Sequence, residues 1–226
     1  MKKRILLLSL LASGGLLVSG VSNAQLNLKQ FGIGGDSSAD AGATASSGGV
    51  SQLLQTYVGA NQQVLSGQSS LASAMGLSSA AGQAQQAAGL LSGGTPSVSQ
   101  LTQMGSTQQS LSQTLTQAFA NRASSAASAT PLNKQAFTDG LSSLGKGVSQ
   151  YSSLQSGLGG IGQMNPSSLL QAGMNPQTAQ AASYIAQSAP GQLQSLMSTL
   201  SSAVQFASSR GISVPSIATA ALKGGQ

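Results

Sequence analysis

The sequence lacks most of the side chains on which enzyme mechanisms depend. Its 226 residues include no histidine, cysteine, tryptophan or glutamate, and only three aspartates. Without histidine and cysteine, the chain cannot build a Ser-His-Asp triad, a Cys-His pair or an ordinary zinc site. Two of the aspartates, Asp36 and Asp40, fall in a Gly- and Ser-rich stretch that lacks the ligand spacing of a calcium loop. We therefore expect a protein that is not an enzyme, with no catalytic residue, no metal ligand and no cofactor.

Charge is also scarce. Charged residues make up 5% of the chain, against about a quarter in ordinary globular proteins. Three of the positive charges, Lys2, Lys3 and Arg4, lie at the N-terminus, and the others are scattered along the chain. A nucleic-acid-binding protein concentrates Lys and Arg on one face, so we expect no nucleic-acid partner. Polarity comes instead from Ser, Gln, Thr and Asn. Such weakly charged surfaces repel each other little, which favours self-association.

The N-terminal residues have the pattern of a secretory signal peptide. Basic residues at positions 2–4 precede an apolar stretch at 5–18, and small residues occupy positions Ser22 and Ala24. A basic start, a short apolar core and small residues before the cut are the three parts of a cleavable signal. The sequence therefore predicts that residues 1–24 are removed and that the mature protein is periplasmic or secreted from a bacterium.

The alternative for this segment is an uncleaved membrane anchor. Gly14 and Gly15 interrupt the apolar stretch, whereas a spanning helix needs about 20 predominantly apolar residues. No second long apolar stretch follows, so we expect no transmembrane span in the mature chain. Peripheral contact with a membrane surface stays open as an alternative.

From residue 50 onward the apolar residues follow a helical period. Val50, Leu53 and Tyr57 begin one stripe, and spacings of three and four residues place such side chains on one face of a helix. The sequence therefore predicts an all-α bundle of about five to seven amphipathic helices at 50–226, after a flexible Gly-, Ser- and Ala-rich segment at 25–49. A largely disordered secreted chain is the alternative, given the composition.

Proline and glycine mark the expected helix ends. Thr or Asn precedes Pro96, Pro131 and Pro176, and a polar cap followed by proline is typical of a helix start. Pro190 predicts a further start, so that residues 176–211 form two helices. The abundant small residues also predict that helices approach one another closely. The expected helical stretches lie at residues 50–65, 69–91, 96–122, 131–158, 166–173, 176–188, 190–211 and 215–222.

Two short motifs fit known chemistry by spacing alone. Ser143 and Lys146 match the S-x-x-K spacing of a nucleophile and its base. The Ser-Asp-Asn and Lys-Thr-Gly motifs that accompany it are missing and serine is abundant, so we interpret the pair as part of a solvated helix face. Residues 157–162 match G-x-G-x-x-G, but a dinucleotide site needs a preceding strand and a later acidic residue. A helix is expected before this stretch and no acidic residue follows it, so we interpret it as a hinge between two helices.

These observations favour an exported, non-enzymatic helical protein of the cell envelope or extracellular space that acts by protein binding or assembly. Its partner would be a second copy or another envelope protein. The alternative is a periplasmic carrier or sensor of an apolar ligand or a membrane surface. A dry pocket would favour the carrier, and a solid core with exposed apolar stripes would favour assembly. Methionine adapts to irregular ligands, and the residues expected to line such a pocket are Met75, Met104, Met164, Met174 and Met197.

Overall fold

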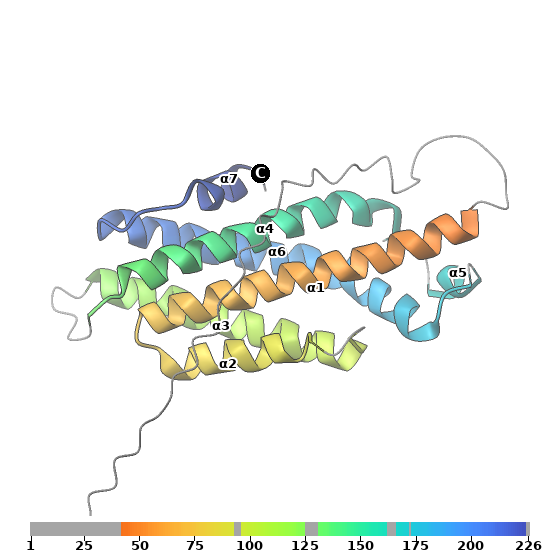
Figure 1. The fold of residues 1–226 in the computed structure, drawn as a ribbon, viewed down its shortest axis with the longest axis horizontal. Helices are drawn as coiled ribbons and strands as arrows, with labels where there is room; N and C mark the ends of the chain where they lie inside the picture. Colours follow the sequence, from red (N-terminus) through yellow and green to blue (C-terminus); the bar gives the residue numbers. More distant parts are fainter. Residues whose placement is uncertain (1–41, 93–95, 125–130, 162–165, 172, 225–226) are drawn as a thin grey trace, which may run out of the picture.

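Seven α-helices and no strand make up the part of the chain that the computed structural model describes, which confirms the all-α prediction (Figure 1). The described residues are 42–92, 96–124, 131–161, 166–171 and 173–224. The predicted signal peptide and most of the segment at 25–49 lie outside these ranges. The helices are α1 (Gly42–Ala74), α2 (Ser78–Gly89), α3 (Val98–Ser124), α4 (Lys134–Ile161), α5 (Pro166–Gln171), α6 (Pro176–Ser209) and α7 (Ser216–Gly224).

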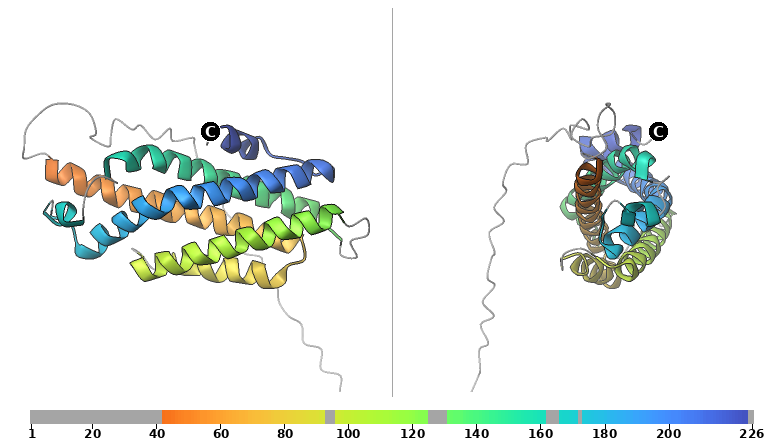
Figure 2. Two further views of the ribbon diagram at one scale, coloured as in Figure 1. Left: turned by 180° about the vertical axis from the view of Figure 1, so that it is seen from behind. Right: turned by 90° about the vertical axis from the view of Figure 1, so that its right-hand side faces the viewer.

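The four long helices run side by side along the long axis of the bundle, as Figure 1 and Figure 2 show from opposite sides. The most extensive contact joins α1 and α4, and a second joins α3 and α6. Helix α4 also packs on α6, so it links the two pairs, and α7 covers part of α4. Helix α2 folds back beside α1 and contacts α3. These contacts allow helices that are marginal alone to stabilise one another.

The apolar stripes of the sequence form a single core. Phe137, Leu141, Leu144, Val148 and Tyr151 follow the predicted spacing along α4, and all of them are buried. Fully burying one large apolar side chain contributes about 1.5–3 kcal/mol. Among the described residues, Leu170 is the only large hydrophobic side chain that is exposed. The core of the bundle is therefore closed, and its outer faces are polar.

Glycines bring the backbones of α1 and α4 into contact. A Cβ atom on Gly67 would lie 2.6 Å from the backbone nitrogen of Leu144. A Cβ on Gly140 would lie 2.9 Å from the backbone nitrogen of Leu71, closer than any side chain tolerates. The two helices can approach this closely only because both positions lack a side chain, as the abundance of small residues predicts.

Helix α6 corrects the expectation of two helices between residues 176 and 211. It runs without a break through Pro190, whose missing N–H leaves the carbonyl of Ala186 without its usual helical partner at a cost of about 3 kcal/mol. Apolar residues before and after the proline lie on one buried face of α6, and their packing on α3 and α4 outweighs that local cost. The buried residues on the two sides of Pro190 are Ala182, Ile185, Ala189, Leu193, Leu196 and Leu200.

The first two helices also differ from the predicted stretches. Helix α1 begins at Gly42 rather than Val50, and it continues to Ala74 through the gap expected between residues 65 and 69. The stripe at 69–91 is instead divided at Gly76, whose φ of 75° lies in the left-handed region that favours glycine. The chain therefore turns at Gly76 because the backbone there requires glycine, which the spacing of apolar residues does not reveal.

The observed helix caps differ from the predicted ones at two of three proline sites. Helix α3 is capped by Ser97, since its Oγ accepts from the backbone N–H of Gln100 at 3.3 Å and Gln100 Oε1 accepts from the backbone N–H of Ser97 at 2.8 Å. Asn133 caps α4 through a 3.1 Å bond from the N–H of Ala136. Only Asn175 caps as predicted, accepting from the N–H of Gln177. The position of the capping side chain, and not that of the proline, therefore determines where α3 and α4 begin.

None of the helices in the described ranges is long and apolar enough to cross a membrane.

Candidate functional site

A group of polar side chains occupies the interior of the bundle. It consists of Tyr57 and Asn61 on α1, Gln108 on α3, Tyr151 on α4 and Gln192 on α6, and we call these five residues the polar cluster. The rings of Tyr57 and Tyr151 meet edge to face, with centroids 5.6 Å apart. Asn61 and Gln108 are 0% and 2% exposed. The four longest helices therefore each contribute to one polar centre.

Hydrogen bonds connect the cluster through two acceptor oxygens. Tyr57 donates its hydroxyl proton to Gln192 Oε1 at 2.9 Å. The hydroxyl of Tyr151 lies 2.7 Å from Asn61 Oδ1 and 2.8 Å from Gln192 Oε1, and its single proton can serve one of them at a time. Gln108 donates from Nε2 to Asn61 Oδ1 at 2.6 Å, and Asn61 donates from Nδ2 to the carbonyl of Tyr57 at 2.7 Å. Each amide is thereby held in one orientation.

The two tyrosine hydroxyls in the cluster are held in their protonated form. Burial raises the pKa of Tyr57 above its usual value, and burial raises the pKa of Tyr151 further, with the neighbouring Tyr57 adding to that rise. A tyrosinate here would face the carbonyl oxygens of Asn61 and Gln192, which accept hydrogen bonds and offer no proton. Both hydroxyls therefore act as donors at neutral pH.

Two amide oxygens beside this network have no hydrogen-bond partner among the described residues. Gln68 donates from Nε2 to Ser112 Oγ at 3.0 Å, but its Oε1 is buried and unpartnered. Gln108 Oε1 is buried and unpartnered as well. Leaving a buried acceptor unpaired costs about 1–3 kcal/mol. These oxygens therefore give the cluster unused capacity to accept hydrogen bonds.

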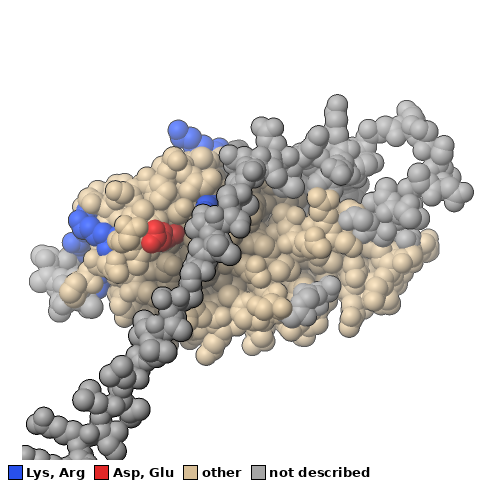
Figure 3. Space-filling view, viewed as in Figure 1, with Lys and Arg blue, Asp and Glu red and all other residues tan. Residues whose placement is uncertain are grey.

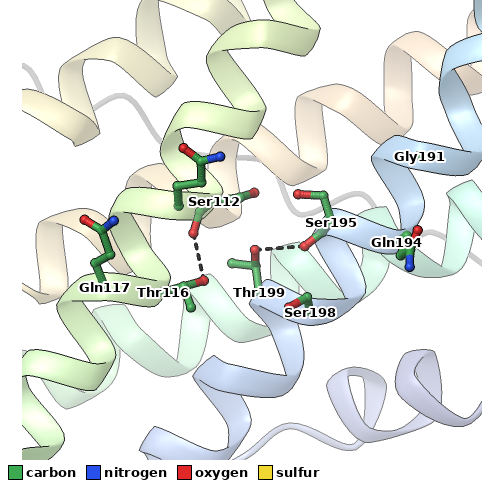
Figure 4. A pocket seen from close by; sticks show the side chains of 9 residues that line it. Ser112, Thr116, Gln117, Gly191, Gln194, Ser195, Ser198 and Thr199 are labelled. Atoms are coloured by element: carbon green, nitrogen blue, oxygen red, sulfur yellow. Dashed lines mark hydrogen bonds between the residues drawn. The ribbon is translucent and has the colours of Figure 1, made fainter.

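A polar groove between α3 and α6 reaches the cluster from outside. We call it the α3/α6 groove and define it by the lining residues Gly105, Gln108, Ser112, Ser188, Gln192 and Ser195, together with the side chain of Tyr184. Its volume is about 480 Å³. It continues along the same two helices into a second hollow of about 490 Å³, and Figure 4 shows Ser112 and Thr116 of α3 facing Ser195 and Thr199 of α6 there.

Among the described residues, no charged side chain lines either part of the groove. On the face that Figure 3 shows, Lys, Arg and Asp side chains gather towards one end of the bundle and over α7, and the remaining described surface carries none. The electrostatics of the groove therefore come from amide and hydroxyl dipoles alone.

The residues singled out in the sequence lie elsewhere. Ser143 is half-buried and Lys146 is exposed on α4, and neither lines the α3/α6 groove. Residues 157–161 continue α4 to its end, while Gly162 lies outside the described residues. Met75, Met104 and Met174 are buried and Met197 is partly buried, all within the core and none in the groove. Met164 lies outside the described residues.

The helical periods of the sequence do not predict the polar cluster, although the sequence contains a signal for it. Asn61 follows Tyr57 by four residues and precedes Val64 by three, so it interrupts the apolar stripe of α1 with a polar side chain. Gln108 stands in the same way between Met104 and Leu111 on α3. A polar residue at a stripe position predicts a buried polar side chain that needs partners, but the sequence does not say which residues supply them.

The cluster and the groove together offer fixed hydrogen-bond donors, unused acceptors and no charge. Such a site suits the binding of a neutral polar group by several directed hydrogen bonds. The polar cluster also restricts how the four helices can pack, because a shift of one helix would leave buried polar atoms unpaired. No protein-family model, curated protein or solved structure matches this chain.

Proposed function

We propose that this chain is an exported, non-enzymatic helical protein of the bacterial envelope or extracellular space that acts by protein binding or assembly. The observation that carries the proposal is the absence of charge from whole helices. Helices α1, α2 and α6 contain no charged residue, and α3 contains only Arg122. Faces of this kind do not repel a second copy, and their Gln, Ser and Thr side chains form hydrogen bonds across a contact.

The described residues lack the exposed apolar stripes that were expected to favour assembly, so the proposal rests on the polar faces of the helices. Large apolar side chains are packed inside the described helices, with Leu170 as the exposed exception. Contact would therefore use the small-residue faces and Gln or Ser hydrogen bonds rather than apolar stripes. The carrier of an apolar ligand needs an apolar pocket, and the described methionines that would line it are instead packed in the core or against it. No observation in the described residues favours the carrier.

Sedimentation velocity of the exported protein over a range of concentrations tests assembly, and cross-linking in cells tests for an envelope partner. We expect a complex whose stability changes little with salt, because its contacts involve few charges. A double substitution Gln55→Glu and Gln62→Glu places like charges on the exposed side of α1 and should weaken a contact that uses this face. A protein that is monomeric throughout and cross-links to nothing contradicts the proposal.

The matched control is Lys146→Ala together with Ser143→Ala on α4. We expect both changes to leave association and folding unchanged, because Lys146 is exposed and Ser143 is half-buried outside the polar cluster. The pair also tests the non-enzymatic part of the proposal. If these substitutions destroyed an activity while the protein stayed folded, the S-x-x-K spacing would mark a nucleophile and its base.

A further inference from the structure

The α3/α6 groove contains polar atoms that no other described residue uses. Gln108 lines the groove, is 2% exposed, and has a buried Oε1 without a hydrogen-bond partner. Ser188 lines the same groove, and its buried Oγ is also unpartnered. We infer that this groove binds an uncharged, polyhydroxylated ligand of the class of neutral saccharides. This inference goes beyond the proposed function and does not depend on it.

The groove also presents a donor in a fixed position. Gln192 Oε1 accepts from the hydroxyl of Tyr57 and lies 2.8 Å from the hydroxyl of Tyr151. A Cβ on Gly105 would lie 2.9 Å from Gln192 Nε2, so the missing side chain leaves room for this amide beside Gly105, and both residues line the groove. Neighbouring hydroxyls of a sugar supply both donors for Gln108 and Ser188 and an acceptor for Gln192.

The ring of Tyr184 completes the lining. Its hydroxyl donates to the carbonyl of Leu101 at 3.3 Å, which ties the side chain of α6 to the backbone of α3. An aromatic ring held in this way offers a flat apolar surface beside the amides. Ligand sites combine such surfaces with a small number of placed polar groups, and a sugar ring has a C–H face and a hydroxyl rim that fit this combination.

Charge and size distinguish a saccharide from other ligands. A charged ligand would find no counter-ion among the described residues that line the groove, because none of them is charged. The volume of about 480 Å³ is in the usual range for small-molecule sites. Gln108 Oε1 and Ser188 Oγ are buried in the free protein, so a ligand contacts them only when side chains at the groove wall move aside. A hydroxyl group requires less movement than a helix from a second copy, which is about 10–12 Å across with its side chains.

The test is a titration of the full exported protein, followed by calorimetry and NMR. The probes are maltotetraose and tetra-N-acetylchitotetraose as neutral ligands, with tetragalacturonate as the charged counterpart of similar length. Saturable binding of a neutral tetrasaccharide, at least about tenfold tighter than tetragalacturonate, supports the inference, since transfer of an uncompensated charge into the groove is unfavourable. The two neutral probes distinguish a plain hexose ligand from an N-acetylated one.

Two variants locate binding in the groove. Gly191→Leu fills it, and because a Cβ at Gly191 meets nothing within 4 Å, the fold should remain intact while affinity falls about tenfold or more. Ser188→Ala removes the unpartnered hydroxyl and should weaken binding about fivefold. The matched controls are Gly82→Leu, also in open space, and Ser152→Ala, which removes another buried unpartnered hydroxyl, on α4. Both should bind as tightly as wild type.

Absence of saccharide binding, a preference for tetragalacturonate, or equal affinity of the Ser188→Ala and Ser152→Ala variants would overturn the inference. If Gly191→Leu fails to fold, the serine pair decides the question alone. Association measured in the same samples separates the two hypotheses. If the protein assembles but binds no saccharide, the inference about the groove is wrong and the proposed function stands. If the protein binds saccharide but stays monomeric and has no envelope partner, the inference stands and the proposed function is wrong.

Discussion

Two regions of the bundle hold the same helices together by different physical means. In the polar cluster, the hydroxyl of Tyr151 on α4 lies 2.7 Å from Asn61 Oδ1 of α1 and 2.8 Å from Gln192 Oε1 of α6, and it donates to one of them at a time. In the second region, which we call the phenylalanine cluster, Phe119 of α3, Phe137 of α4 and Phe206 of α6 meet with centroids 5.5 to 5.7 Å apart. The polar cluster stabilises the bundle through directed hydrogen bonds, and the phenylalanine cluster stabilises it through buried apolar area.

The difference predicts which substitutions each region tolerates. An aromatic cluster without polar atoms loses stability in proportion to the volume removed, and it accepts another apolar side chain of similar size. A buried hydrogen-bond network tolerates such an exchange poorly, because the partners left behind stay buried and unpaired. Phe137 and Asn61, both 0% exposed, are the positions at which the two regions can be compared most directly.

The largest effect is expected from Phe137→Ala. This substitution removes the ring that contacts both Phe119 and Phe206 and should lower the free energy of unfolding by about 3–5 kcal/mol. Phe137→Leu should cost only about 1 kcal/mol, since most of the volume remains. Urea unfolding followed by circular dichroism measures both. Equal losses of stability in the two variants would show that the shape of the ring, and not its buried area, determines how much Phe137 stabilises the protein.

The next effect is expected from Asn61→Leu, which preserves size but removes the hydrogen bonds. Gln108 Nε2 would lose its acceptor, whereas the hydroxyl of Tyr151 could still donate to Gln192 Oε1, and one unpaired buried donor costs about 1–3 kcal/mol. The double variant with Tyr151→Phe should lose less than the sum of the two single changes, because they share a hydrogen bond. A loss of under about 0.5 kcal/mol for Asn61→Leu would remove the contrast with Phe137→Leu.

A third effect should appear only in alkaline solution. The pKa values of Tyr57 and Tyr151 are raised by burial in the folded protein, whereas an unfolded tyrosine ionises near pH 10.0. Above that pH the unfolded chain releases protons that the folded chain keeps, so the free energy of unfolding is constant below it and falls as the pH rises further. Urea unfolding at neutral and at strongly alkaline pH should show this fall.

Variants of the polar cluster and of the phenylalanine cluster should differ in how much their free energy of unfolding falls in the same alkaline experiment. Tyr151→Phe should make the fall shallower, because the group with the larger rise in pKa is gone. Phe137→Leu should keep the full fall, since no titratable group is removed. Retention of the full fall in Tyr151→Phe would assign the alkaline sensitivity to groups outside the polar cluster.

The smallest effect concerns the edge of the phenylalanine cluster. The guanidinium of Arg210 lies over the ring of Phe206, 5.7 Å from its centroid, and donates to the carbonyl of Arg122. Arg210→Met keeps the apolar stem but removes the charge, and it should cost about 0.5–1 kcal/mol. Lys146→Met, at an exposed position on α4, should cost nothing measurable and is the control. Equal effects of the two changes would show that the charge of Arg210 does not stabilise the phenylalanine cluster.

Most of the fold could be predicted from the sequence, and the candidate site could not. The apolar spacing on α4 predicted the buried face that contains Leu141, Leu144 and Val148, because a helical period depends only on neighbouring residues. The prediction failed at Pro190, where packing of distant helices outweighs a local preference, and at Gly76, where the turn depends on backbone conformation. Local sequence patterns therefore predict where helices form more accurately than where those helices begin and end.

The sequence by itself determined that the chain is helical, has almost no charge on five of the described helices, and lacks histidine, cysteine and glutamate. Only the tertiary structure brought Asn61 to Tyr151, 90 residues away, and Gln108 to Asn61 across 47 residues. It also left Gln108 Oε1 and Ser188 Oγ unpartnered at the wall of one groove. The physical reason is that a helical period is a local property, whereas the partners of a buried polar atom come from whichever helices pack around it.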